Sequence, residues 1–482
     1  MAQNTKKQTS APKLNTRLQV GFDKASCIIL LFFALLPTLY IPIYYGNGDT
    51  WINDSSIFTY LGGIAALLVG LTYIITRFSA DRNWLGNSLK AKPWLICLLI
   101  AGVWAFISCL LAENVSVAFW GHDHRRDGFF LLLCYLGVMG TALILKNRQY
   151  KNILLRVLIL AAVPVVAVML AQYFGDAYTT ISNGSSTSIL KNTKSSVFLN
   201  SNHLGYYQAI TLAALSGMIC WDFFNTKISP KARLIWEIGW LVLLIFFSWC
   251  LIINNTFGAY LAVLIGLAFT ALIFTVKASH LKLVKRLFFW VPLVLFLITT
   301  LVICFGFSST QAAKNFNRNF NSLSLDLSHA DLSETLEESK PNKSAYTGNK
   351  NAYARLLLWQ FSWQMIEKEP VFGYGADSIS SILTAAEFNN SDQDRPHNEY
   401  LQYATYYGLP FLALLLAGLI LLFLQQLFNL KYKKLSQETL IALGALLTYW
   451  ASAFVGVAIF NTAIYAFILI GLAAASPTQE TN

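Results

Sequence analysis

Apolar stretches close to 20 residues long recur along the chain from about residue 24 to about residue 475, separated by short polar segments. Each stretch is long enough to cross a hydrocarbon core of about 30 Å as a helix. The last two share one apolar block in which only its length and Gly456 indicate a hairpin. The pattern predicts about twelve transmembrane helices, at 24–45, 57–76, 93–112, 128–145, 153–173, 203–221, 234–253, 257–276, 287–307, 399–424, 438–455 and 458–475. We therefore expect an all-α, polytopic integral membrane protein.

The composition agrees, and the charges indicate an orientation. Of the 482 residues, 56% are hydrophobic and 12% charged, whereas soluble domains carry about a quarter charged residues. Lys and Arg resist translocation near a span, and 23 of the 35 basic residues lie in the N-terminal tail and alternate short loops. Both termini are expected in the cytoplasm, and the net charge of +11 indicates topology, not nucleic-acid binding.

This topology divides the chain into five parts: a cytoplasmic tail (1–23), nine spans (24–307), a large extracytoplasmic loop (308–398), three spans (399–475) and a second cytoplasmic tail (476–482). The first span has no small-residue cleavage site after it, so we expect it to be retained. All seven cysteines lie inside predicted spans. That leaves no pair for an external disulfide and no Cys/His metal spacing.

The large loop contains one segment with helical periodicity. Leu356, Trp359, Trp363 and Ile366 recur at helical spacing before Pro370, and Arg355 lies on the same stripe. One interpretation is a helix on the membrane surface, with the arginine reaching water or lipid phosphate. The other is a helix that covers an external cavity and directs Arg355 at a bound anion. The glycine-rich segment 372–378 that follows is expected only to reverse the chain.

The stretch DRPHNEYLQY, residues 394–403, precedes the tenth span. Pro396 suits a first helical turn, so His397 is predicted at the outward N-terminus of that span. The helix dipole there favours the neutral imidazole, which can accept a proton. Arg395 can bind phosphate through two parallel hydrogen bonds. The alternative is an ordinary interfacial histidine within an aromatic belt that includes Tyr400.

Two further polar clusters face outward. GHDHRRDG, residues 121–128, places Arg125 and Arg126 in an external loop, where basic residues are disfavoured. They indicate either an acidic ligand such as a diphosphate or local pairing with Asp123 and Asp127. The second cluster, at the start of the sixth span, consists of Asn200, Asn202 and His203. Carboxylates are scarce within the spans, which disfavours an ion-coupled transporter.

The chain resembles the O-antigen ligase and O-antigen polymerase superfamily of bacterial envelope proteins. The resemblance covers the arrangement of about twelve helices with one large, late external loop. It is most specific in ARLLLWQFSWQMIEKEPVFGYGADS and RPHNEYLQYATYYGLP, between Arg355 and Pro410. FLNSNHLGYYQ and WGHDHRRDG are also similar to segments of the family. The fold implied resembles the glycosyltransferase C-type membrane fold, with short helices in the external loop.

The resemblance implies an activity. Members transfer a glycan from an undecaprenyl diphosphate carrier to an acceptor hydroxyl on the outer side of the bacterial cytoplasmic membrane, using no nucleotide sugar, cofactor or metal. By this resemblance His397 activates the acceptor and Arg355 engages the diphosphate. One departure is that many relatives carry an arginine at the outer start of the eighth span, where this chain has Thr256 and Phe257. Arg125 or Arg126 is expected to replace it.

We therefore expect an inverting, metal-independent glycosyltransferase of lipid-linked oligosaccharide. Its partners are the carrier-linked glycan, membrane lipids and a glycan, lipid or protein acceptor. The residues do not distinguish a ligase from a polymerase or from a protein O-oligosaccharyltransferase. A transporter or flippase of lipid-linked sugars and a structural assembly subunit remain alternatives. The expected site comprises catalytic His397 and Arg355, diphosphate-binding Arg395, Arg125 and Arg126, and donor or acceptor contacts at Asn200, Asn202, His203, Trp359, Asn398 and Tyr400.

Overall fold

The structure is a computed structural model of the chain. It describes residues 16–47, 51–122, 126–174, 179–183, 186–190, 195–198, 200–223, 229–307, 310, 313–314, 350–379, 395–432, 434–457 and 459–474. Arg125 and most of the predicted loop 308–398 lie outside these residues, as do the tail 476–482 and most of the tail 1–23.

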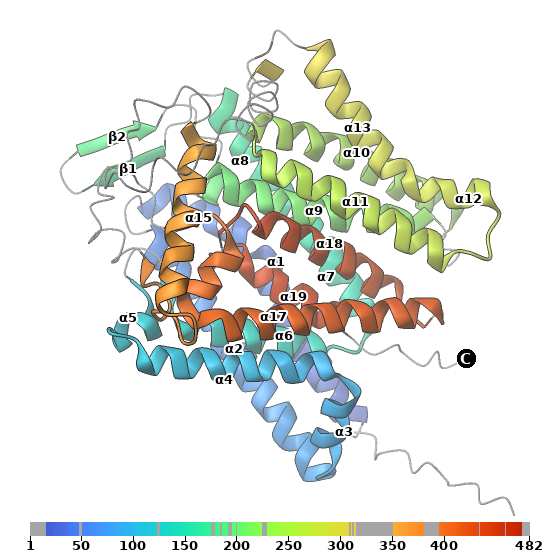
Figure 1. The fold of residues 1–482 in the computed structure, drawn as a ribbon. Helices are drawn as coiled ribbons and strands as arrows, with labels where there is room; N and C mark the ends of the chain where they lie inside the picture. Colours follow the sequence, from blue (N-terminus) through green and yellow to red (C-terminus); the bar gives the residue numbers. More distant parts are fainter. Residues whose placement is uncertain are drawn as a thin grey trace, which may run out of the picture.

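The described residues form a bundle of helices (Figure 1). Its first half contains α1 (Thr16–Asn47), α2 (Trp51–Ala80), α3 (Trp84–Ala91), α4 (Pro93–Leu111), α5 (Val115–Trp120), α6 (Phe129–Ile144), α7 (Arg148–Leu160), α8 (Ala162–Phe174), η2 (Ser196–Phe198) and α9 (Ser201–Phe223). The second half contains α10 (Pro230–Asn254), α11 (Phe257–Lys277), α12 (Leu283–Leu287), η3 (Phe288–Trp290), α13 (Val291–Leu301), η4 (Val302–Gly306), α15 (Lys350–Lys368), α17 (Glu399–Lys431), α18 (Gln437–Ala453) and α19 (Ala463–Ala473).

Eight helical segments are long and apolar enough to cross a membrane, so the chain is a multi-pass membrane protein. They are Thr16–Ile41, Ser56–Ala80, Pro93–Leu111, Arg148–Phe174, Pro230–Asn254, Phe257–Lys277, Leu283–Gly306 and Glu399–Lys431. The four other predicted spans are also helical, as α6, α9, α18 and α19. However, α6 and α19 are shorter apolar helices. The expected fold class is thus confirmed as helical, with eight of about twelve spans supported.

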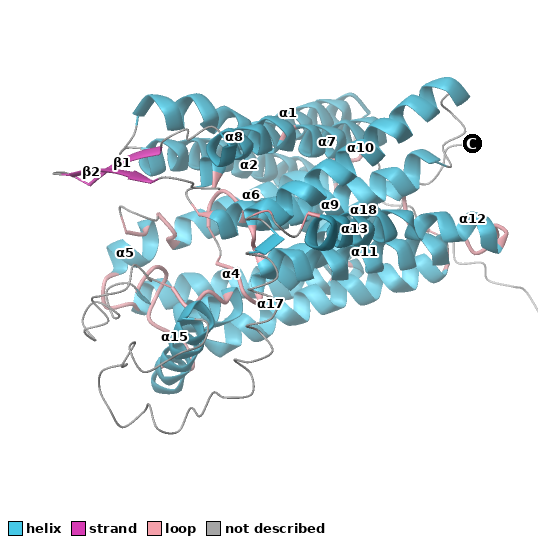
Figure 2. Cartoon of the chain, turned by 90° about the horizontal axis from the view of Figure 1, so that it is seen from above, coloured by secondary structure: helices cyan, strands magenta, loops and turns pink. Residues whose placement is uncertain are grey.

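One short hairpin departs from the all-α expectation. Strands β1 (Thr179–Asn183) and β2 (Ser186–Leu190) pair antiparallel, with Thr179 opposite Leu190. Magenta arrows mark them in Figure 2. Their sequences, TTISN and STSIL, contain β-branched residues that favour strands. These runs are too short and polar to stand out beside long apolar helices.

Local signals set several helix starts. The Asn147 side chain accepts hydrogen bonds from two N–H groups of the first turn of α7, and the Ser436 side chain accepts one from the N–H of Thr439 in α18. Ser229 caps α10, where Pro230 occupies the first helical position and lacks only an N–H that would have no partner inside the helix. These caps determine where α7, α10 and α18 begin.

Helix α9 lies at the centre of the bundle. All of its residues from His203 to Asp222 are buried, and it packs against α10, α11 and α18. Helices α11 and α18 approach closely because each presents a glycine to a threonine of the other. A methyl group on Gly266 would collide with Thr448, and one on Gly444 would collide with Thr270. Small residues of this kind let membrane helices pack backbone to backbone.

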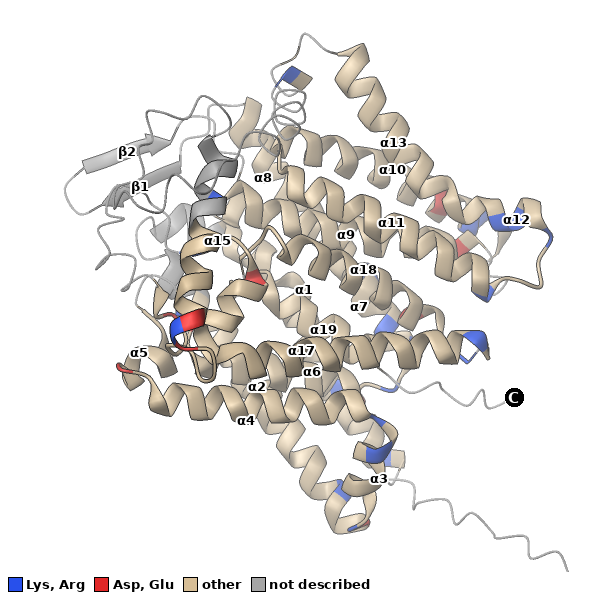
Figure 3. Ribbon diagram, viewed as in Figure 1, with Lys and Arg blue, Asp and Glu red and all other residues tan. Residues whose placement is uncertain are grey.

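The two ends of the bundle differ in charge. Figures 1 and 2 show α5, α15, the start of α17 and the hairpin at one end, here called the site end. Figure 3 shows Lys and Arg gathered at the opposite end, which carries α3 and α12 and is here called the basic end. The positive-inside rule predicts that the basic end is cytoplasmic.

Candidate functional site

His397 lies immediately before α17, in a left-handed backbone conformation with φ of 51°. The next residue, Asn398, is the N-cap, and its side chain accepts hydrogen bonds from the N–H groups of Tyr400 (3.0 Å) and Leu401 (3.1 Å). The expectation that Pro396 lies in the first turn is wrong, because the asparagine cap starts the helix later. His397 is nevertheless at the helix N-terminus, as predicted, and it lies at the site end.

Arg395 connects three segments that are distant in sequence. Its side chain is 2% exposed and forms ion pairs with Asp127 (2.9 Å) and Asp377 (3.5 Å). Gln402, one turn into α17, donates a hydrogen bond to Asp127 as well (2.9 Å). The loop before α6, the turn after α15 and the start of α17 therefore meet at one buried guanidinium. Arg395, Asp127 and Asp377 are called the arginine cluster below.

The loop between α5 and α6 is held against this cluster through its main chain. The N–H of His122 donates to Asp377 (2.7 Å), and the Tyr60 hydroxyl donates to the carbonyl of Arg126 (2.7 Å). Arg126 also has a left-handed backbone, with φ of 55°. The predicted acidic loop residue Asp127 thus binds an arginine of another segment.

Helix α17 is broken at Gly408, where φ is 84° and ψ is 169°. A side chain there would collide with the carbonyl of Val371. Two carbonyls before the break, of Thr405 and Tyr406, accept hydrogen bonds from the N–H groups of Tyr374 and Gly375 (both 2.9 Å). The glycine-rich turn therefore satisfies main-chain groups that the break exposes, which is more than the chain reversal expected of it.

Helix α4 holds the other side of this turn. The Trp104 indole donates to the carbonyls of Val371 (3.2 Å) and Tyr407 (3.1 Å), and the same ring stacks on Phe372 with centroids 4.9 Å apart. Burial raises the pKa of Tyr374 in the turn, and Glu369 raises it further.

Helix α15 confirms the predicted helix in the large loop, but its buried face differs from the predicted stripe. Leu358, Met365 and Ile366 are buried, and α15 packs against α17. Trp363 is 50% exposed and donates a hydrogen bond to Glu367 (2.8 Å). Trp363, on the predicted stripe, lies on the exposed side of α15, whereas Ile366 on the same stripe is buried. The side chain of Leu356 lies outside the described residues.

Arg355 is half-buried on α15, and its charge acts on Tyr206 of α9. Glu399, in the first turn of α17, acts on the same tyrosine. Glu399 is buried and accepts hydrogen bonds from the Tyr449 hydroxyl at 3.0 and 2.9 Å. The charge of Arg355 therefore acts on the region where α9 and the start of α17 meet.

Two indole donors lie beside this region. The Nε1 atoms of Trp359 and Trp450 are buried and have no hydrogen-bond partner among the described residues. The Trp359 ring meets Phe454 edge to face, with centroids 5.5 Å apart. The Tyr400 hydroxyl donates to the carbonyl of Trp450 (2.7 Å). Buried donors without partners are costly, so these two indoles are suited to receive a hydroxyl or phosphate oxygen.

The second predicted polar cluster occupies the start of α9. The Asn200 side chain accepts a hydrogen bond from the N–H of Asn202 (2.8 Å), and His203 is 7% exposed. Thr256 donates to the carbonyl of Ser201 (3.1 Å). The position where the resemblance implies an arginine thus carries a small side chain that packs against α9.

The structure adds residues that the sequence patterns did not assign to the site, namely Asp377, Gln402, Glu399 and Gly408, and it gives Asp127 a partner, Arg395, in another segment. Only Asp127 and Asp377 could have been proposed for the site from the sequence, since each is an acidic residue in a glycine-containing segment that is predicted to face outward. No cluster of three or more His, Cys, Asp or Glu side chains suited to a metal occurs among the described residues.

Comparison with known proteins gives a family match. Residues 241–416 fit the family model described as O-antigen ligase, and the resemblance inferred from the sequence is confirmed. No curated protein and no solved structure matches the chain. The matched segment runs from α10 into α17 and includes Arg355, Asp377, Arg395 and His397, whereas Asp127 lies outside it.

Proposed function

Because residues 241–416 match the O-antigen ligase family model, we propose that the chain transfers a glycan from undecaprenyl diphosphate to an acceptor hydroxyl. The reaction takes place at the site end, on the extracytoplasmic face of the bacterial cytoplasmic membrane. Residues 24–307 and 399–475 form the membrane part, and 308–398 form the external loop. The observation that carries the proposal is the position of His397, held in a left-handed conformation between a buried ion-paired arginine and a helix cap.

His397 acts as the general base. The helix N-terminus beside it disfavours the imidazolium and favours the neutral ring, which can accept a proton. Because Asn398 and Arg395 fix the main chain on both sides, the ring has a defined position relative to an incoming acceptor. General-base catalysis of this kind contributes typically 10²–10⁴ in rate.

Arg355 binds the diphosphate. Its half-buried guanidinium makes a stronger charge-assisted bond to phosphate than an exposed one would, and it stabilises the charge that develops on the leaving group. Trp359 lies one turn further along α15 and offers its buried N–H to the same ligand. Asn200, Asn202 and His203, at the start of α9, face the donor or acceptor sugar, and Arg126 supports the diphosphate from the neighbouring loop.

The proposed step is an in-line displacement. The acceptor oxygen loses its proton to His397 and attacks the anomeric carbon, forming the new glycosidic bond. The bond from that carbon to the diphosphate oxygen breaks, and undecaprenyl diphosphate leaves with the electron pair. Attack from the face opposite the leaving group inverts the anomeric configuration. The residues provide a base and cationic groups for this step, so the proposed mechanism uses no metal.

Arg395 has a different role in this proposal from direct diphosphate binding. Both of its carboxylate partners are within ion-pair distance and the side chain is buried, so its charge is already compensated. We assign it to positioning His397, two residues along the chain.

The test is reconstitution of the purified protein in liposomes with an undecaprenyl-diphosphate oligosaccharide and candidate acceptors. The decisive variant is His397→Asn, because asparagine tolerates the left-handed backbone and removes only the base. His280→Asn is the matched control, since His280 is an exposed histidine at the basic end. We expect His397→Asn to lose at least 100-fold in transfer rate and the control to keep it.

The products distinguish the forms of the activity. A ladder formed from the donor alone identifies a polymerase, and a single shifted band that requires an added glycan or lipid acceptor identifies a ligase. A band that requires an acceptor protein identifies a protein O-oligosaccharyltransferase. Equal rates for His397→Asn and wild type would refute the proposed base. Carrier lipid that crosses the bilayer without a new glycosidic bond would refute the transferase and support a flippase.

A further inference from the structure

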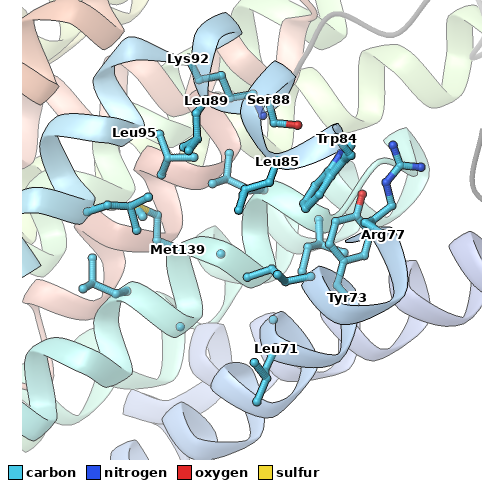
Figure 4. Close-up of a pocket in the computed structure, with 18 of the residues that line it drawn as sticks. Leu71, Tyr73, Arg77, Trp84, Leu85, Ser88, Leu89, Lys92, Leu95 and Met139 are labelled. Atoms are coloured by element: carbon cyan, nitrogen blue, oxygen red, sulfur yellow. The ribbon is translucent and has the colours of Figure 1, made fainter. Parts of the chain in front are cut away.

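A cavity of about 820 Å³ lies in the half of the bundle opposite the His397 site. It is bounded by the second half of α2, by α3, by the start of α4 and by the end of α6. Figure 4 shows Leu85, Leu89, Leu95 and Met139 around it, with Arg77 and Lys92 at its edge. The cavity therefore combines an apolar body with basic groups at the basic end of the protein.

The basic groups of the cavity are close enough to affect each other. Arg77, Lys92, Lys146 and Lys151 line it, and the Arg77 guanidinium lies over the Trp84 ring, 5.3 Å from its centroid. Burial lowers the pKa of Lys92, and Lys146 lowers it further. Burial likewise lowers the pKa of Lys146, with Arg77 adding to the effect. A bound anion would relieve both the burial cost and the repulsion.

Asp23 offsets part of the charge of Lys146, and Glu438 and Asp23 offset part of that of Lys151. Asp23 accepts a hydrogen bond from the main-chain N–H of Lys146 (2.7 Å), and Glu438 forms an ion pair with Arg148 (3.2 Å) outside the cavity. In the parts of the chain that the structure describes, no carboxylate is within ion-pair distance of Lys92 or Lys146. The ammonium groups of Lys92 and Lys146 can therefore pair with an anionic ligand.

The apolar part continues onto the outer surface of the helices. Leu71, Ile74 and Leu99 line the cavity and are also 56%, 44% and 46% exposed. On a helix that crosses a membrane, such side chains face lipid. An acyl chain can therefore pass from the bilayer into the cavity without crossing a polar barrier.

Glycines leave part of this space unfilled. Gly70 of α2 and Gly140 of α6 both line the cavity, and a Cβ atom added at either would meet nothing within 4 Å. The space is consequently open to an occupant from outside the chain.

We propose that this cavity binds one anionic phospholipid of the leaflet at the basic end, with its phosphate between Lys92, Lys146 and Arg77 and an acyl chain along α2 and α4. Charge selects the headgroup, and the leucine-lined body selects a lipid over a free anion. The site is separate from the one that holds His397.

The experiment uses the full-length protein purified in detergent and native mass spectrometry, with phosphatidylglycerol and phosphatidylcholine titrated in parallel. The first variant, Lys92→Gln with Lys146→Gln, removes two charges, and Lys285→Gln is its control because Lys285 is exposed on α12. The second variant, Gly140→Leu, fills the open space without changing charge. Gly239→Leu is its control, since Gly239 on α10 also has nothing within 4 Å of an added Cβ.

We expect wild type to prefer phosphatidylglycerol, the paired lysine variant to lose about fivefold in affinity per charge removed, and Gly140→Leu to lose binding of the lipid while remaining folded. Both controls should match wild type. Equal binding of the two lipids or unchanged binding in both test variants would overturn the proposal. So would binding of inorganic phosphate alone that is as tight as binding of phosphatidylglycerol.

Discussion

Replacing Arg395 by methionine tests whether the arginine cluster holds the His397 site together. The change removes the guanidinium but keeps a long side chain. The side chain of Arg395 is 2% exposed, and those of its partners Asp127 and Asp377 are 12% and 3% exposed. The change would therefore leave two carboxylates with little access to water and without a positive charge beside them. Removing one partner of a buried ion pair typically costs about 3–5 kcal/mol. We therefore expect Arg395→Met to lower the free energy of unfolding by about that amount.

Neutralising the carboxylates should reverse most of this loss. Asparagine at position 127 can still accept the hydrogen bond from Gln402, and asparagine at position 377 can still accept the one from the His122 N–H. The triple variant Asp127→Asn, Arg395→Met, Asp377→Asn has no buried unpaired charge. We expect it to recover more than half of the lost stability.

The assay is equilibrium unfolding in mixed detergent and dodecyl sulfate micelles, followed by tryptophan fluorescence. Arg82→Met is the control, because Arg82 is exposed in the loop after α2, and we expect it to change stability by less than about 0.5 kcal/mol. If Arg395→Met were as stable as this control, or if the triple variant were no better than the single one, the ion pairs would not hold the site. A stable Arg395→Met protein with weakened donor binding would instead indicate direct contact with diphosphate.

Three further predictions concern individual positions of the site. Glu399→Leu should cost about 1–3 kcal/mol in thermal unfolding assays because the buried hydroxyl of Tyr449 loses its acceptor, whereas Glu399→Gln should keep most of the stability. Gly408→Ala should cost at least about 1–2 kcal/mol, since the residue has a left-handed backbone and no room for a methyl group; Gly239→Ala, with open space around it, should cost nothing. Arg355→Gln should raise the donor concentration needed for half-maximal transfer by at least 10-fold, with partial recovery in Arg355→Lys, and an unchanged concentration dependence would remove Arg355 from the diphosphate site.

The sequence predicted the helical membrane class because long apolar runs in a chain with few charges have almost no other stable outcome. It also predicted a helix at 351–370 and a histidine at the start of a helix near 399, since prolines and apolar residues at helical spacing are local signals. These features depend on residues that are close together in the chain.

Contacts between distant segments could not be predicted from local sequence signals. The pairing of Arg395 with Asp127 spans 268 residues, and nothing near either residue specifies the other. The break at Gly408 depends on a turn more than 30 residues earlier, so the apolar run alone suggests one continuous helix. The buried row of α15 depends on where α17 lies, so helical spacing alone does not tell which residues of α15, such as the exposed Trp363, face away from the bundle.

The break at Gly408 has a consequence for protein engineering. Before it, α17 shares main-chain hydrogen bonds with the turn after α15, and after it the N–H of Leu409 donates to the carbonyl of Pro370 (2.8 Å). The first nine residues of α17 thus form a structural unit with the turn after α15, although they are continuous with a transmembrane helix. A chimera that exchanges acceptor preference between related enzymes should be joined beyond Leu409, because a junction at the apparent membrane boundary would separate groups that fold together.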